Sequence, residues 1–255
     1  SWTGLKWPQP GLCGSNCPGT PLTITYSYQN MFDGSLRMPN GKPLPNGLIR
    51  KSIEEALGLW ANYAPLNFVE VEDDGLTYSQ GSTKHGQIRF RHVHINGPDP
   101  AVGNPIAKAQ AYFPGSSNPL AGDVEFDRSD RWQKVGTLAQ PDILGATIHE
   151  VGHSLGLNHS TLENPNEFWT WKVYDQSGNI VDHFTPKGAT NMFWIFPRFA
   201  GPGTGVLYPD DIAGIRFIYG TGQGSVYPLA RTIPEPSTIA LLLLGVLHCR
   251  LHRRR

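Results

Sequence analysis

The 255-residue sequence predicts an α+β fold in which short strands are interspersed with three helices. Two observations lead to this class. Several short segments alternate apolar and polar residues, which is typical of strands, and three longer segments carry apolar residues at helical spacing. The 29 glycines and 22 prolines indicate many loops and turns around a compact frame. A hydrophobic content of 39% suits a globular domain with a substantial core.

The N-terminal half is expected to hold three strands and one long helix. The helix is predicted within 46–68, where Ile49, Ile53, Ala56 and Trp60 recur at helical spacing and Pro65 ends the pattern. Alternation predicts strands at 22–28, 67–72 and 86–95. In the third strand Ile88 and Phe90 should face one side, and Arg89 and Arg91 the other.

The second half begins with a glycine- and proline-rich loop at 96–105 and a short strand in "AQAYF". A central helix should start near Pro141 and Asp142 and run to Leu155, where Gly156 can turn left-handed and stop it. Its apolar stripe recurs at spacings of four, three and four residues: Leu144, Ile148, Val151 and Leu155. Beyond it, 168–184 reads as a hairpin and 207–220 as a final helix.

The segment "HEVGHSLGLNHS" carries the strongest chemical signal of the chain. On a helix His149 and His153 project from nearly the same side, so both can bind one metal ion. Gly156 lets the chain reverse so that His159 supplies a third nitrogen. Three imidazoles leave a fourth position open, which is typical of a catalytic zinc site. The alternative is that these histidines are ordinary polar positions on an exposed helix.

This HExxHxxGxxH pattern resembles that of the metzincin metallopeptidases, and Ser160 points to the matrixin branch, the matrix metalloproteinases and their bacterial relatives. The segments "IRKSIEEALGLWANYAPLNFVEV", "AQAYFPG…GDVEFDRSDRW" and "DDIAGIRFIYG" are also similar to matrixin segments. The resemblance covers about residues 21–222. It implies a zincin-like domain with a twisted mixed sheet, an active-site helix, a second long helix and a C-terminal helix.

The resemblance implies a zinc endopeptidase that cleaves protein or peptide substrates. Glu150 would act as general base on a zinc-bound water and pass the proton to the departing amine. An extended peptide would lie along the edge strand at Ala111, Tyr112 and Phe113. Met192 is the candidate for the methionine that metzincins place in a turn beneath the zinc, and it could equally be a simple core residue.

Two other metal sites of matrixins are altered or uncertain here. Matrixins bind a structural zinc through histidines at the positions of Gln110 and Glu125, so we expect this second zinc to be absent or altered. His92 and His94 could serve a metal or could be packing and surface residues. The aspartates that match the family's calcium loop could bind calcium or form a solvated acidic loop: Asp123, Asp127 and Asp130.

The cysteines and the charge pattern indicate a disulfide and argue against a nucleic-acid partner. Cys13 and Cys17 are expected to form a local disulfide, with a second zinc site as the alternative. The formal net charge is zero, and no basic face interleaved with aromatics is evident, which argues against a nucleic-acid partner. We expect a monomer.

The C-terminal segment "IPEPSTIALLLLGVLHCRLHRRR" combines Pro-Glu-Pro, a short apolar run and an arginine-rich end. The run at 239–247 is too short for a comfortable membrane span. The architecture resembles a PEP-CTERM sorting signal of Gram-negative bacteria. It implies export, transient membrane anchoring, contact with sorting machinery, and release or attachment at the cell surface. The start at Ser1, without methionine or leader, indicates a removed signal peptide or missing upstream residues.

The chain therefore divides into an N-terminal loop segment, a peptidase domain with a hairpin insert, a linker and a sorting signal: 1–20, 21–222 with the insert at about 161–189, 223–233 and 234–255. The rival hypothesis is a surface-anchored binding or matrix protein that retains the fold with little activity. The complete ligand set and Glu150 favour the enzyme. The long insert and the altered second metal site favour the rival.

Overall fold

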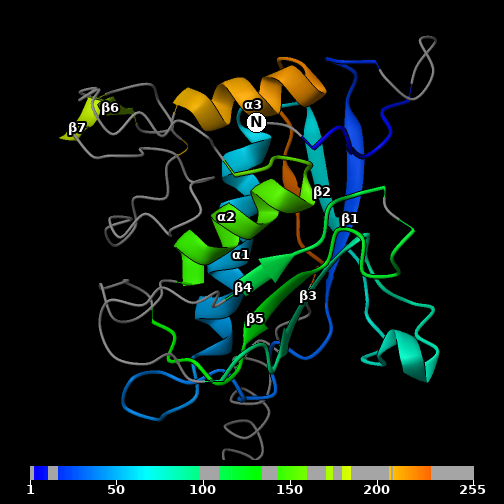
Figure 1. Cartoon of the computed structure of the whole chain (residues 1–255), viewed down its shortest axis with the longest axis vertical. Helices are drawn as coiled ribbons and strands as arrows, with labels where there is room; N and C mark the ends of the chain where they lie inside the picture. Colours follow the sequence, from blue (N-terminus) through cyan, green and yellow to red (C-terminus); the bar gives the residue numbers. More distant parts are fainter. Residues whose placement is uncertain are drawn as a thin grey trace, which may run out of the picture.

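The computed structural model describes residues 3–10, 17–97, 109–115, 117–133, 143–159, 207 and 209–230, together with the backbone of 171–174 and 180–184. A six-stranded sheet forms its frame, in the order β4-β5-β3-β1-β2-β8 (Figure 1). All neighbouring strands are parallel except β4, which runs antiparallel to β5 at one edge. The strands are β1 (Leu22–Tyr28), β2 (Leu66–Glu70), β3 (Ile88–Val93), β4 (Ala109–Ala111), β5 (Val124–Asp127) and β8 (Val226–Tyr227). The predicted mixed sheet is confirmed.

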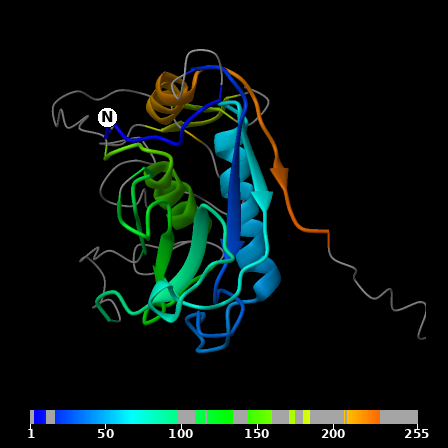
Figure 2. The ribbon, with the colours of Figure 1, turned by 90° about the vertical axis from the view of Figure 1, so that its right-hand side faces the viewer.

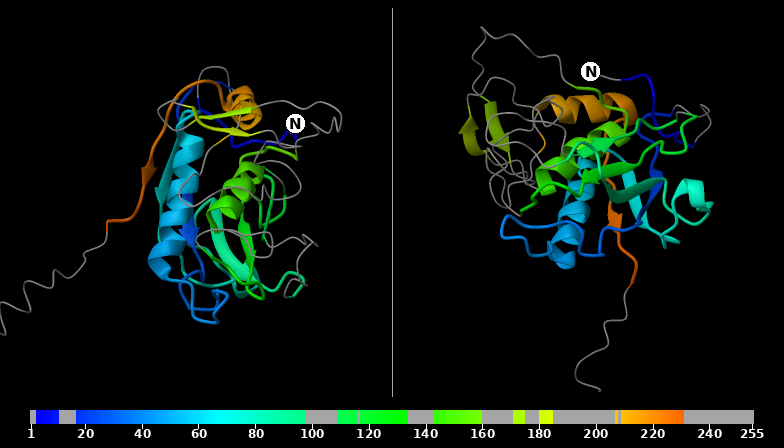
Figure 3. Two further views of the ribbon diagram at one scale, coloured as in Figure 1. Left: turned by 90° about the vertical axis from the view of Figure 1, so that its left-hand side faces the viewer. Right: turned by 60° about the horizontal axis from the view of Figure 1, so that its bottom comes forward.

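Two helices pack against each other on one face of this sheet. Helix α1 (Asn46–Ala61) lies against β2 and β8, and α2 (Ile143–Ser154) lies against β4 and β5 (Figures 1 and 3). Ile49, Ile53, Ala56 and Trp60 of α1 are all buried, as their helical spacing predicts. Every residue of α2 is buried, so this helix is enclosed on all sides and its polar side chains have little access to solvent.

The core lies between the two helices and the sheet. The apolar residues of β1 and β3 that face the helices include Ile24, Tyr26, Ile88 and Phe90, each with no exposed surface. The two aromatic rings Tyr26 and Phe90 meet edge to face at 6.3 Å between centroids. Alternation along β3 sends Arg89 and Arg91 to the opposite face, as predicted from the sequence.

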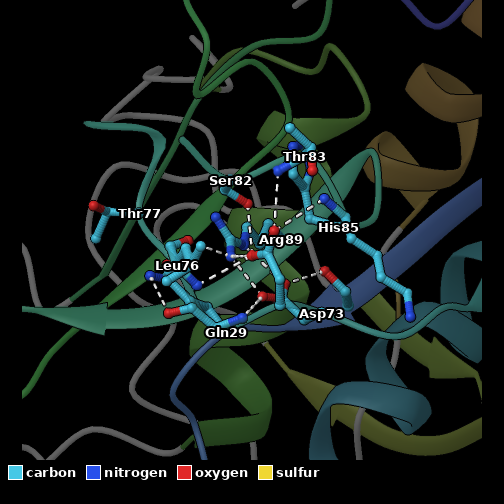
Figure 4. Close-up of polar contacts among 12 residues, drawn as sticks. Gln29, Asp73, Leu76, Thr77, Ser82, Thr83, His85 and Arg89 are labelled. Atoms are coloured by element: carbon cyan, nitrogen blue, oxygen red, sulfur yellow. Dashed lines mark hydrogen bonds and ion pairs between the residues drawn. The ribbon is translucent and has the colours of Figure 1, made fainter. Parts of the chain in front are cut away.

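A long loop after β2, containing the short 3-10 helix η1 (Tyr78–Gln80), covers that opposite face. Arg89 holds it: the buried guanidinium donates through Nε to Asp73 and through Nη2 to the carbonyl of Leu76 (Figure 4). Asp74 in turn accepts hydrogen bonds from the backbone N–H groups of Thr83 and Lys84. Arg89, which the alternation of β3 directs away from the core, therefore holds the loop after β2 against the sheet.

Helix α3 (Pro209–Tyr219) crosses the end of the fold near the C-terminus of α2, and Gly220 follows it with a φ of +86° (Figure 1). The predicted hairpin is present as two antiparallel strands, β6 (Trp171–Tyr174) and β7 (Ile180–Phe184), and its turn lies outside the described residues. Within the part of the chain that the structure describes, no helix is long and apolar enough to cross a membrane.

The two segments that flank the expected peptidase domain both contact it. The segment 223–233, expected to be a linker, contributes β8, which pairs with β2 and completes the sheet. The N-terminal loop segment is fastened to the domain: Cys17 is buried and disulfide-bonded, although Cys13, its expected partner, lies outside the described residues.

Candidate metal centre

Helix α2 presents the first two histidines from successive turns. It ends in a Schellman motif, in which the N–H of Leu157 bonds to the carbonyl of Gly152 and the N–H of Gly156 to that of His153, at 3.0 and 2.9 Å. Gly156 has a φ of +99°, a conformation that a residue with a side chain rarely adopts. The predicted stop at Gly156 is confirmed, and it returns the chain toward the helix so that His159 faces the same point.

The three imidazoles converge on one point through the same ring atom. The Nε2 atoms of His149 and His153 lie 3.1 Å apart, those of His153 and His159 also 3.1 Å, and those of His149 and His159 3.3 Å. Zinc–nitrogen bonds of about 2.0–2.1 Å place the nitrogens of a tetrahedral shell about 3.3–3.4 Å from each other. The observed triangle is close to this value, so the donor set fits a zinc ion. Among the described residues it is the one group of three or more metal-ligating side chains.

A backbone carbonyl fixes the protonation of His153. The Nδ1 atom lies 2.8 Å from the carbonyl oxygen of Leu157, which can only accept, so Nδ1 carries the proton and Nε2 keeps its lone pair. Burial, with a smaller contribution from the charge of His159, lowers the pKa of His153 to about 4, although the hydrogen bond to Leu157 acts in the opposite direction. Burial also lowers the pKa of His159. Both imidazoles therefore favour the neutral form that a metal requires.

Glu150 lies on α2 between the two helical histidines. Its side chain is 4% exposed, and burial raises the pKa of its carboxyl group to about 8. In the described part of the chain no hydrogen-bond donor reaches this carboxylate. A buried carboxylate with a raised pKa beside metal-ligating imidazoles is a type of group that often takes part in proton transfer.

The edge strand runs close to this group. Strand β4 is hydrogen-bonded to β5 on one side only, which leaves its other edge unpaired within the six-stranded sheet. Just after it, the ring of Phe113 meets the ring of His153 edge to face at 5.6 Å between centroids. The chain directly after β4 therefore lies beside His153.

Among the described residues, the three aspartates that match the calcium loop do not meet in a group of three or more metal-ligating side chains. Asp123 accepts from the hydroxyl group of Tyr78 at 3.2 Å, and burial raises its pKa to about 7. Asp127 accepts from the N–H groups of Asn96 and Ser129 at 2.9 and 2.8 Å. Asp130 is buried nearby. The calcium site and the solvated acidic loop therefore both stay predictions for these residues.

The place expected for a second zinc is occupied by a polar network without histidine. Glu125 on β5 pairs with the guanidinium of Arg91 on β3, and it also accepts from the amide of Gln110 and, at 3.2 Å, from the hydroxyl group of Tyr112. Gln110 and Glu125 face each other in the β4–β5 register. This donor set satisfies its own charges and does not fit a zinc ion.

The two other candidate histidines have ordinary partners. His92 is buried, and its Nε2 lies 3.0 Å from both carboxylate oxygens of Asp33. The Nδ1 atom of His94 lies 2.9 Å from the hydroxyl oxygen of Ser129. Neither belongs to a metal-ligating group within the described residues. The contacts of both residues suit the packing and surface interpretation, which stays a prediction.

Several predicted features lie outside the described residues: Met192, most of the insert at 161–189, Cys13 and the segment 234–255. Conversely, the structure brings two contacts to the site that were not predicted, the Leu157 carbonyl at His153 and the Phe113 ring. A carbonyl group carries no sequence signal, because every residue has one. Phe113 was predicted as a residue of the edge strand, but its contact with His153 was not.

The sequence is similar to known matrixins over the region that contains the three histidines. A family model described as Matrixin matches residues 35–182, which include all three histidines and Glu150. Matrix metalloproteinase-C of Caenorhabditis elegans is 34% identical over 183 residues, covering 69% of this chain and 26% of that protein. An interstitial collagenase of Equus caballus is 29% identical over 204 residues, covering 78% of this chain and 34% of the collagenase. Matrix metalloproteinase-17 of Homo sapiens is 34% identical over 140 residues, covering 54% of this chain and 22% of that protein. The chain thus spans no more than about a third of the length of these curated relatives.

Proposed function

The chain belongs to the matrixin family, and from this premise we propose that it is a zinc-dependent endopeptidase that hydrolyses peptide bonds with Glu150 as general base. The observation that carries the proposal is the convergence of three Nε2 atoms within 3.1–3.3 Å beside a buried carboxylate. The histidines would hold the ion and leave one side of it open to solvent and substrate. When bound there, zinc would polarise the scissile carbonyl and acidify a coordinated water molecule.

Glu150 moves the proton in this reaction. Its carboxylate accepts a proton from the attacking water and then donates it to the departing amine, so the group ends each cycle as it began. Burial raises the pKa of Glu150 to about 8. Because this pKa lies close to neutral pH, the carboxyl group can both accept and release a proton. The absence of a donor to Glu150 from the described residues leaves both oxygens available for this task.

The substrate would bind in an extended conformation along the free edge of β4. Peptide N–H and C=O groups can add a strand to an exposed sheet edge, with alternate side chains directed to the protein. Ala111, Tyr112 and Phe113 are the residues of this edge that lie nearest the histidines, as the contact between Phe113 and His153 indicates. The site would therefore accept unfolded segments or loops of protein substrates.

We also propose that the protein is exported and acts as a monomer. The tail at 234–255, which resembles a bacterial sorting signal, would hold the protein at the membrane through its arginines until processing near Pro234. The disulfide at Cys17 supports export, because disulfides persist in oxidising compartments. Release into the medium, or attachment at the cell surface, would follow.

The test combines digestion of casein with metal analysis. Wild type should cleave casein, lose activity in a chelator and regain it with added zinc. Glu150→Gln should retain zinc and lose activity by several orders of magnitude, whereas the same change in α1, Glu55→Gln, should leave activity near that of wild type. Near-normal turnover by Glu150→Gln would reject the mechanism. An inactive wild type that binds zinc would favour the rival, a surface-anchored binding protein that retains the fold.

A further inference from the structure

The C-terminal end of α2 needs hydrogen-bond donors from elsewhere in the chain. The last carbonyl groups of a helix have no intrahelical partner and must be satisfied by other groups. The Schellman motif satisfies the carbonyls of Gly152 and His153. The next three carbonyls, those of Ser154, Leu155 and Gly156, lie directly before the turn that carries His159.

Side chains distant in sequence satisfy all three of these carbonyls. The indole N–H of Trp7 donates to Ser154 at 2.9 Å, and the hydroxyl group of Tyr219 donates to Leu155 at 2.9 Å. Thr3 donates to Gly156 twice, through its backbone N–H at 3.1 Å and its hydroxyl group at 3.0 Å. Two of the three anchors therefore come from the N-terminal segment, residues 3–10.

The N-terminal segment is itself fixed by two other elements. The N–H of Trp7 donates to the hydroxyl oxygen of Tyr219, and Lys6 donates to the carbonyl of Ile218 at 3.1 Å, both at the end of α3. The Trp7 ring lies over Gly122 between β4 and β5, so closely that a Cβ atom at Gly122 would come within 2.5 Å of it. Figure 2 shows the segment running between α3 and the end of α2.

We propose that residues 3–10 form a positioning element for the metal centre, with Trp7 as its main contact. The segment joins the end of the ligand helix, the loop after the edge strand and α3. It thereby fixes the start of the turn from Gly156 to His159 relative to His149 and His153. The inference rests on the proposed function in one respect, that the ion held by the three histidines is zinc.

The physical reason is that a metal shell tolerates little displacement of its ligands. His149 and His153 are fixed by α2 itself, whereas His159 depends on the path of a turn. Contacts that orient metal ligands typically contribute 10- to 100-fold to metal affinity or activity. Removing the Trp7 donor leaves the Ser154 carbonyl unsatisfied at the base of that turn, which allows the turn to move.

The experiment measures zinc affinity in the full chain by competition with a chromophoric chelator. Trp7→Phe keeps an aromatic ring over Gly122 and removes the N–H donor. We expect about a tenfold weaker zinc affinity and faster amide exchange at Gly156 and Leu157. Trp132→Phe is the matched control, because the Trp132 indole also donates to a carbonyl, that of Asp127 at 2.8 Å, but does not contact α2 through that bond.

The outcomes separate this inference from the proposed function. Weaker zinc binding in Trp7→Phe, with affinity retained in Trp132→Phe, supports the positioning role. Zinc binding by Trp7→Phe within twofold of wild type overturns the inference while the endopeptidase proposal stands. An equal loss in Trp132→Phe also overturns it, because the effect would then follow from general destabilisation. Failure of wild type to bind zinc overturns both.

Discussion

The indole N–H of Trp60 in α1 donates a hydrogen bond to the backbone carbonyl of Ile148 in α2, with 3.0 Å between the two atoms. Both residues are fully buried, and Ile148 directly precedes the first metal-ligating histidine. The bond joins the two helices that share one face of the sheet. The position of the ligand helix therefore depends on a polar contact as well as on apolar packing.

Trp60→Phe tests the energy of this contact. The substitution removes the N–H donor and part of the ring volume, while the Ile148 carbonyl keeps its intrahelical partner. We expect the free energy of unfolding to fall by about 1–3 kcal/mol, the sum of a lost buried hydrogen bond and a small cavity. Urea denaturation of the two proteins measures it. A loss below about 0.5 kcal/mol would mean that the bond contributes no net stability.

The network of Arg91, Glu125, Gln110 and Tyr112 predicts a zinc content of one ion per chain. The guanidinium already pairs with Glu125, and this carboxylate accepts two further hydrogen bonds, from Gln110 and Tyr112. Among the described residues, no histidine belongs to this network. Elemental analysis of the purified protein measures the ratio. Two zinc ions per chain, with the second lost on Glu125→Gln, would contradict the prediction.

The ion pair between Arg91 and Glu125 should also stabilise the folded protein. Arg91→Met leaves the Glu125 carboxylate, which is 4% exposed, without its cation, and we expect a loss of about 2–5 kcal/mol in the free energy of unfolding. The double variant Arg91→Met/Glu125→Gln removes both charges and should recover part of this loss. An additive double variant would show that the two groups do not interact.

The elements predicted from the sequence are those whose signal is local. The alternation of β1 and β3, the apolar stripe of α1 and the glycine that stops α2 each follow from a few neighbouring residues. Strand β8 was missed because two residues carry no periodic pattern, and their pairing with β2 comes from tertiary contact. The zinc triad was predictable because a helix and one glycine turn fix its geometry within eleven residues.

The relationships that were missed depend on register and on distant segments. Gln110, Arg91 and Glu125 meet because three strands align them, and a single sequence does not contain that alignment. Asp123 and Asp127 are close in sequence, yet one reaches Tyr78 and the other the amides of Asn96 and Ser129. The contact of Trp7 with the end of α2 joins residues that are 147 positions apart in the sequence.

Asp123 should make stability depend on pH. Burial raises the pKa of its carboxyl group to about 7 in the folded protein, against about 3.9 in the unfolded chain. Between these values the folded state binds a proton that the unfolded state does not, so this group makes the protein less stable as pH rises from about 4 to 7. Asp123→Asn removes the titration. It should stabilise the protein at pH 8 by about 1–3 kcal/mol, with the gain vanishing near pH 5.

Chemical denaturation at pH 5 and pH 8, with and without calcium chloride, checks this prediction. The calcium arm also tests the calcium site proposed from the sequence. If Asp123 binds calcium, its carboxylate is needed, and Asp123→Asn should lower stability specifically when calcium is present. A variant that is less stable than wild type at pH 8 in calcium-free buffer would contradict the pH prediction itself.

The backbone of the edge strand predicts which positions a substrate can use. The N–H of Tyr112 bonds to the carbonyl of Asp123, and the carbonyl of Tyr112 accepts from Gly122, so both groups face the β5 side. Backbone groups alternate between the two sides of an extended chain, so those of Ala111 and Phe113 should face the open edge. Ala111→Pro removes one N–H that the sheet does not use. It should raise KM for peptide substrates several-fold with little loss of stability.

Gln110→Pro provides the matched comparison, because alternation directs the N–H of residue 110 toward β5. That variant loses a ladder hydrogen bond and the contact of Gln110 with Glu125, so it should be less stable by about 3 kcal/mol. Steady-state kinetics and urea denaturation of both variants separate the two effects. An unchanged KM in Ala111→Pro would remove the strand-addition mode from the proposal, because a peptide paired with β4 requires the N–H at this position.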